Sequence, residues 1–455
     1  MSNDKPIDIR DFIHDDEVVA FVMEHVDMLM PWDRFKTMDM PAGLSPETMW
    51  EVMEFVRLTG SHQQMPLSRT SDEDAGGKSW YGVPSKMSSL LARLVFRGRT
   101  FGELDTRLEQ HHDARRRHPF LVADLSAALT RDGLDVDPET IIMLLAKEKD
   151  PVTPEERLLA NVLDILESLD AYRTWDFDSQ LYDELQARLD EGCESMPYKP
   201  LRRPPTSYNA YGGQGQDDPL AKYSQEQKKW CIDFISTHIN PCQFDCPAPI
   251  IAIVITSDLI CEERPFPRWN AFMEIVLRKL SFDRIGMRAL ASVPFSRALL
   301  DWELGLPPAN DLPFAFGHAI FRSRYGINAT PYLMQLLQFF EQGLDDIERE
   351  TNRMATRFDN CRSALERDWR LNHRQRKLLM RFVMKPSERI DSAAYENEHD
   401  VTLATARADL KKLVRMGYLQ LGTCGKKQVF SPVPRMERVI LEHDQALCAT
   451  TPPSS

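Results

Sequence analysis

Apolar residues recur at helical spacing near the C-terminus of the chain. The pattern predicts a first helix over residues 372–384, which ends at Lys385 because the next residue is a proline and supplies no backbone hydrogen-bond donor. It predicts a short second helix over residues 390–398 and a third helix after Thr402, whose hydroxyl suits an N-cap. The apolar side of the third helix is expected to consist of Leu403, Ala406, Leu410, Leu413 and Val414.

Gly417 predicts the end of the third helix, because glycine readily adopts the left-handed conformation of a residue that follows a helix. Residues 418–421 and 428–431 then predict a hairpin, and Lys426 and Lys427 lie at its tip. Three helices followed by a hairpin form the order of a winged helix-turn-helix. We therefore predict such a domain over residues 365–440.

Charge is unevenly distributed along the chain. The formal net charge of the 455 residues is −13, yet residues 365–435 contain fifteen Lys and Arg against eight Asp and Glu, a local balance of +7. The remaining residues therefore carry −20. This distribution attracts nucleic acid to the C-terminal segment and repels it from the body of the protein.

The polar side of the third predicted helix supplies the candidate DNA contacts. In a helix-turn-helix this helix enters the major groove, and a basic wing can follow the phosphate backbone. We predict contacts to double-stranded DNA from Thr405, Arg407, Lys411, Lys412, Arg415, Lys426 and Lys427. The alternative is a protein-docking or dimerisation module whose charged side is only solvated. Asp409 would approach phosphate unless it pairs with a basic residue one turn away.

Composition favours a globular protein with short helices. Hydrophobic residues make up 42% and charged residues 27% of the chain, and thirty prolines outnumber the twenty glycines. The longest apolar run, residues 249–255, is too short to cross a bilayer, and the first residues lack a signal-peptide pattern. We expect a cytoplasmic protein without a membrane partner. Residues 15–30 predict an amphipathic helix that either packs on the core or forms an interface.

Eight scattered cysteines suit a reducing compartment. His238, Cys242 and Cys246 lie four residues apart, but Pro241 and Pro247 interrupt the helix that would bring them together. No fourth ligand is close in sequence. We therefore expect no metal site.

Residues 264–275 resemble the active-site motif of the Fic family of nucleotidyl transferases, His-Pro-Phe-x-Asp-Gly-Asn-Gly-Arg-x-x-Arg. Pro265, Phe266 and Asn270 match this motif. Residues 371–410 are similar to the start and the recognition helix of the C-terminal winged helix of bacterial Fic proteins. The resemblance implies a mainly α fold, with a Fic-like helical core and a small β-hairpin flap followed by the winged helix. It divides the chain into an N-terminal helical region over 1–110, a degenerate Fic domain over 111–360 and the winged helix.

Other residues occupy the chemically active positions of that motif. Arg264 replaces the histidine base and cannot accept a proton at any useful pH, and Arg268 replaces the acidic magnesium ligand and would repel the ion. The two glycines and the two arginines that bind phosphate are replaced by Trp269, Ala271, Phe272 and Ile275. We therefore expect no catalytic residue and no required cofactor, while Arg264 and Arg268 leave residual ATP binding open.

The resemblance also includes the family's inhibitory motif, Ser-x-x-x-Glu-Gly. The matching positions hold Ala128, Asp132 and Gly133. In the family the inhibitory glutamate pairs with a phosphate-binding arginine. Because both such arginines are replaced, we expect the carboxylate of Asp132 to lack a partner.

These observations favour a catalytically inactive Fic-like protein that binds DNA and regulates transcription through its winged helix. A homodimer would read half-sites about one helical turn apart. One alternative is a pseudoenzyme that captures a protein segment along the flap, residues 201–223. Another is an AMP transferase that uses Glu262 or Glu263 as a non-standard base.

Overall fold

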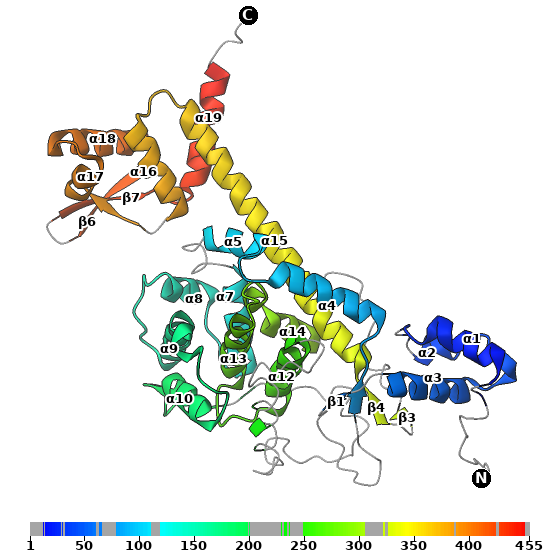
Figure 1. The fold of residues 1–455 in the computed structure, drawn as a ribbon. Coiled ribbons are helices and arrows are strands. Elements are labelled where there is room, and N and C mark those ends of the chain that lie inside the picture. Colours follow the sequence, from blue (N-terminus) through cyan, green and yellow to red (C-terminus); the bar gives the residue numbers. More distant parts are fainter. Residues whose placement is uncertain are drawn as a thin grey trace, which may run out of the picture. The chain divides into compact units, whose positions relative to one another are not determined.

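The protein is mainly helical, as expected (Figure 1). It divides into two compact units, the first within residues 1–105 and 119–344 and the second within residues 106–118 and 345–455. The computed structural model describes residues 12, 14–28, 30, 32–60, 63–65, 79–110, 119–198, 200, 229, 232–233, 236, 249–304, 322–323, 326–385, 388–424 and 427–450. The predicted flap, residues 201–223, lies outside these residues. So does the segment with His238, Cys242 and Cys246.

The first unit consists mostly of helices of eight to fifteen residues. Local signals place several of their ends: Thr153 and Glu156 form a reciprocal capping box at the start of α9, and Asp178 caps α10. The helices are α1 (Asp16–His25), α2 (Trp32–Phe35), α3 (Pro46–Gly60), α4 (Ser85–Gly98), α5 (Glu103–Gln110, which crosses into the second unit), α7 (Pro119–Arg131), α8 (Pro138–Leu145), α9 (Pro154–Glu167), α10 (Ser179–Asp190), α12 (Pro249–Glu263), α13 (Asn270–Arg284) and α14 (Phe295–Glu303). None of the described helices combines the length and the apolarity that crossing a bilayer requires.

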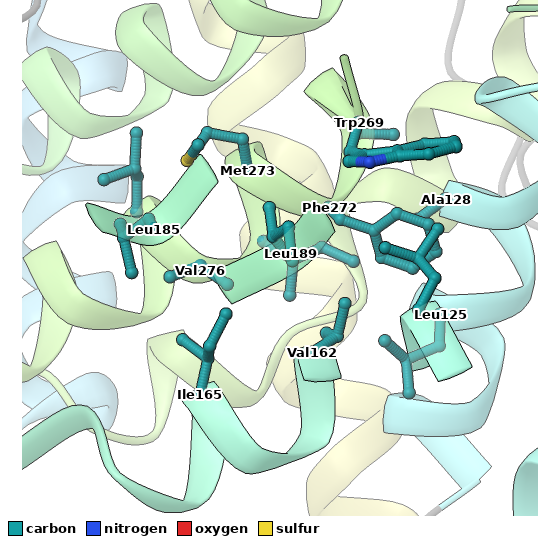
Figure 2. Packing of buried hydrophobic residues seen from close by; sticks show 14 of the residues in the cluster. Leu125, Ala128, Val162, Ile165, Leu185, Leu189, Trp269, Phe272, Met273 and Val276 are labelled. Carbon is teal, nitrogen blue, oxygen red and sulfur yellow. The ribbon is translucent and has the colours of Figure 1, made fainter. Parts of the chain in front are cut away.

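Helix α13 lies at the centre of the first unit's core. Figure 2 shows its residues Phe272, Met273 and Val276 among apolar side chains from α7, α9 and α10. Ile275 is also fully buried. The positions that correspond to the two phosphate-binding arginines of the Fic motif are therefore apolar contacts in this core.

A fully buried ion network joins α13 to α7. The guanidinium of Arg278 donates to Asp124 at 2.7 Å, to Glu274 at 2.6 Å and to the carbonyl of Val293 at 2.9 Å. Ser296 donates its backbone N–H to Asp124 and its hydroxyl to Glu274. Because donors on Arg278 and Ser296 satisfy both carboxylates, this network stabilises the packing and offers no vacant charge.

The first unit also contains a small four-stranded sheet that the sequence did not predict. Its strands are β1 (Gln63–Met65), β2 (Ser79–Tyr81), β3 (Arg322–Ser323) and β4 (Gly326–Asn328), in the order β1-β2-β4-β3. The central pair, β2 and β4, is parallel, and the two outer pairs are antiparallel. Strands of two or three residues are too short to show a hydrophobic alternation.

Helix α15 (Thr330–Arg367) contradicts the expectation of short helices, because it runs for 38 residues. Its proline lies in the first turn, where proline is tolerated, and none follows. Gly343 provides a close approach within the first unit, since a Cβ atom there would lie 2.4 Å from Cγ1 of Val293. The many prolines of the chain thus lie outside this helix and do not limit its length.

The second unit contains the predicted helices and hairpin, with one correction. Helix α16 (His373–Met384) has a capping box at Asn372, and helix α18 (Leu403–Arg415) is capped by Thr402 and followed by Gly417 at φ 80°. Strands β6 (Leu419–Cys424) and β7 (Lys427–Pro432) form the hairpin, and helix α19 (Met436–Thr450) follows.

The predicted second helix begins later than expected. Ile390 and Asp391 form a strand, β5, that pairs with β7 opposite Phe430 and Val429, and helix α17 covers Ser392–His399. The prediction was wrong at this end because the side chain of Asp391 accepts the backbone N–H of Ala394 and so caps the helix.

The buried side chain of Asp409 connects α16, α17 and α18. It is buried on α18, and its carboxylate accepts hydrogen bonds from Asn372, Arg374 and Gln375 of α16 at 2.9 to 3.2 Å. The hydroxyl of Tyr395 on α17 donates to the same carboxylate at 3.3 Å. Burial, with the nearby Asp409 charge, raises the pKa of Tyr395, so the tyrosine stays a donor.

We expect Asp409→Ala to lower the free energy of unfolding of the second unit by about 3 kcal/mol, because it leaves buried donors and the Arg374 charge without an acceptor. Urea unfolding followed by circular dichroism measures this change. Lys411→Ala, an exposed position on the same helix, should change stability by less than about 0.5 kcal/mol. Equal effects of the two substitutions would contradict the role of Asp409.

Candidate functional site

The outward side of α18 carries three basic residues in one stripe. Arg407, Lys411 and Arg415 are exposed and follow one another at intervals of four residues, so they lie on one face of the helix. Within the described part of the chain, none of the three has an ion pair. Their positive charge is therefore available to an external anion.

Small residues lie beside this stripe. Ala404 and Ala408 are exposed, and Thr405 is half-buried at the start of the helix, where its hydroxyl lies 3.0 Å from that of Thr402. Short side chains allow the backbone of a helix to approach a ligand surface closely. The exposed face of α18 thus combines small side chains with the positive charge of the stripe.

Two of the predicted basic contacts are already engaged within the protein. The ammonium of Lys412 donates to the backbone carbonyl of Arg370, and Lys412 is half-buried. Lys427 is exposed on the hairpin but lies 3.8 Å from a carboxylate oxygen of Asp391. Lys426 lies outside the described residues.

The orientation of Asp409 removes the one acidic side chain of α18 from the exposed face. The sequence left two possibilities open for Asp409, an approach to phosphate or a pair with a basic residue one turn away. The carboxylate instead turns inward and pairs with Arg374 of α16 at 3.0 Å. The exposed face of α18 therefore carries positive charge alone.

Sequence reasoning missed an exposed tryptophan in a segment that contacts α18. Trp369 is 79% exposed, and the neighbouring Arg370 contributes the carbonyl that accepts the Lys412 ammonium, so this segment lies against α18. The sequence feature that could have indicated this residue is an aromatic side chain between two arginines, Arg367 and Arg370. Both arginines pair with aspartates, at Asp444 and Asp368.

In the first unit, the loop between α12 and α13 holds the residues that resemble the Fic motif. Arg264 and Trp269 have left-handed backbones, with φ of 49° and 57°. The side chain of Asn270 closes the loop, because it accepts the backbone N–H of Phe266 and donates to the carbonyl of the same residue, each at 2.9 Å. Pro265 is buried in this loop.

Arg268, whose guanidinium the sequence left open as a possible contact for ATP, is engaged within the protein. Its guanidinium donates to the carbonyls of Cys193, Glu194 and Met196 and lies 3.1 Å from Asp190. It also stacks over the ring of Trp269 at 4.3 Å. These contacts satisfy its charge and anchor the loop to the end of α10.

Asp132 follows α7, and its carboxylate lies at the N-terminus of α13, where it has hydrogen-bond partners although the two arginines of the motif are replaced. Its carboxylate accepts the backbone N–H of Ala271 at 3.2 Å and the hydroxyl of Tyr198 at 3.1 Å. Burial raises its pKa to about 6, against the opposing effects of these hydrogen bonds and of Arg264 and Arg131. An internal carboxylate therefore already fills the position at which a helix N-terminus would bind an external anion.

No protein-family model matches the chain, and no curated protein sequence matches it. The resemblance to Fic proteins therefore stays a hypothesis based on the residues themselves. Among the described residues, no group of His, Cys, Asp and Glu is arranged to hold a metal ion.

We expect the raised pKa of Asp132 to make the first unit less stable as the pH rises from about 4 to about 6. The folded state binds this proton more tightly than the unfolded state, so the stabilisation is complete at low pH and is lost through the folded pKa. The difference in free energy of unfolding between Asp132→Asn and the wild type should grow by roughly 2 to 3 kcal/mol over that range.

Urea unfolding at a series of pH values measures this difference, and exposed Asp135→Asn controls for the loss of one negative charge. A constant difference between Asp132→Asn and the wild type would show that Asp132 does not titrate between the folded and unfolded states.

Proposed function

We propose that the protein is a DNA-binding regulator whose second unit acts as a winged helix and whose first unit is a Fic-like body without AMP-transfer activity. The observation that carries the proposal is the stripe of Arg407, Lys411 and Arg415 on α18. These side chains point outward, and the acidic Asp409 of the same helix is turned inward. A duplex is the partner that this arrangement fits best.

The arrangement supports DNA binding in two ways. Exposed arginine and lysine side chains can contact phosphate, and an arginine can also bridge two acceptors of guanine in the major groove. Ala404 and Ala408 keep the N-terminal half of α18 narrow enough to approach base edges. The adjacent Trp369 adds an exposed ring whose indole N–H can donate to phosphate.

The contacts of the first unit support the absence of AMP transfer. Arg264 cannot act as a base, and Asp132 accepts a backbone N–H at the start of α13. A triphosphate could bind at this N-terminus only if the carboxylate of Asp132 were displaced from the N–H of Ala271. The fully buried Phe272 and Ile275 cannot contact phosphate.

We expect the full-length protein to shift a double-stranded fragment of its own promoter at about 50 mM salt, where phosphate contacts are strong. Arg407→Ala combined with Lys411→Ala should weaken binding at least about tenfold, because both side chains lie on the exposed face of α18. The slope of log affinity against log salt should become shallower by about 0.9 for each phosphate that the variant no longer neutralises. Gel-shift titrations at several salt concentrations measure both quantities.

The matched control is Arg353→Ala combined with Arg362→Ala, which removes two exposed positive charges from α15 of the same unit. This control should retain the affinity of the wild type. No shift at low salt, or an equal reduction of affinity in both double variants, would refute DNA binding through α18.

We expect no transfer of label from α-labelled ATP to protein in the presence of magnesium, because the base and the phosphate-binding groups of the Fic motif are replaced. The measurement is autoradiography after incubation with a cell extract. Label that disappears in Glu263→Ala would instead establish a transferase with a non-standard base.

A further inference from the structure

The second unit contains a cavity that the proposed DNA-binding surface does not use. Its volume is about 980 Å³, and it lies between α15, the end of α16, the connector after β7 and helix α19. Val433 and Leu441, both partly exposed, contribute apolar surface to it, and the buried Phe382 and Val383 lie beneath. The volume falls at the upper end of the range of about 300 to 1,000 Å³ that small-molecule sites occupy.

The charged groups of the cavity leave an excess of positive charge. Three arginines and two glutamates line it. Arg438 and Glu442 pair with each other at 2.6 Å and so neutralise one another. The remaining charged residues of the lining are Arg357, Arg435 and Glu437, which leaves one positive charge in excess.

Neither Arg357 nor Arg435 has an ion pair or a side-chain hydrogen bond with any described residue. Arg435 also has a left-handed backbone, with φ 54°, although it is not a glycine. Such a conformation persists only where its surroundings hold it, and here Pro434 precedes it and α19 begins directly after it. Arg435 thus lines the cavity from a connector whose backbone is strained at this residue.

We propose that this cavity binds a small organic monocarboxylate, with its apolar body against Val433 and Leu441 and its carboxylate held by Arg357 and Arg435. Arginine matches a carboxylate in a bidentate geometry, and the apolar residues of the lining favour an organic anion over an inorganic one. Glu437 on the wall disfavours ligands with a second negative charge.

Octanoate is a suitable probe, and octylammonium is its control with the same chain and the opposite charge. Calorimetric titration of the full-length protein should detect octanoate and not octylammonium. Arg357→Gln and Arg435→Gln should each weaken octanoate binding at least about tenfold. Arg353→Gln, one turn earlier on α15 and paired with Glu350, should bind octanoate as the wild type does.

A further variant tests the position of the ligand. Gln445 is exposed and lines the cavity, so Gln445→Trp should block it without removing core packing, and circular dichroism verifies the fold. The proposal is wrong if octanoate does not bind, if octylammonium binds equally well, if neither arginine variant loses affinity, or if Gln445→Trp leaves binding unchanged. Because these titrations contain no DNA, their outcome is independent of DNA binding by α18.

Discussion

The inward turn of one carboxylate, that of Asp409, determines both the packing and the surface of the second unit. Its hydrogen bonds with Asn372, Arg374 and Gln375 fix α18 against α16, and the hydroxyl of Tyr395 adds α17. Asp409 is the only acidic residue of α18. The same contacts that hold the helices together therefore leave the outer face of α18 with positive charge alone, so that packing inside the unit produces its external electrostatics.

A second carboxylate has a comparable role in the first unit. Asp132 accepts a backbone N–H at the start of α13 and a hydroxyl from Tyr198, which in turn accepts a hydrogen bond from Asn270. The carboxylate of Asp132 thus connects the loop before α13 to the end of α7. The same carboxylate occupies the position at the N-terminus of α13 where an anion would bind. The inward orientation of Asp409 leaves positive charge alone on the outer face of α18. The orientation of Asp132 places a carboxylate where an external anion would otherwise bind at the start of α13.

The sequence predicted those features that depend on near neighbours. The start of α18 at Thr402 and its end at Gly417 both follow from local backbone chemistry, and so does the hairpin. Contacts between residues far apart in sequence were not accessible: Asp132 lies 139 positions from Ala271, and Arg268 lies 75 positions from Cys193. A strand of two residues, such as β5, shows no hydrophobic periodicity. The predicted helix over residues 390–398 therefore included this strand.

The burial of Phe272 and Ile275 explains why the first turns of α13 cannot carry phosphate-binding arginines after simple substitution. Both side chains are fully buried in a core that α7, α9 and α10 complete (Figure 2). An arginine at either position would place a charge in this apolar interior, and an unpaired buried charge costs several kcal/mol. To bind phosphate at the start of α13, these helices would have to repack around the new arginines, and Asp132 would have to release the backbone N–H of Ala271. This conclusion follows from packing alone and holds whether or not the resemblance to Fic proteins reflects common descent.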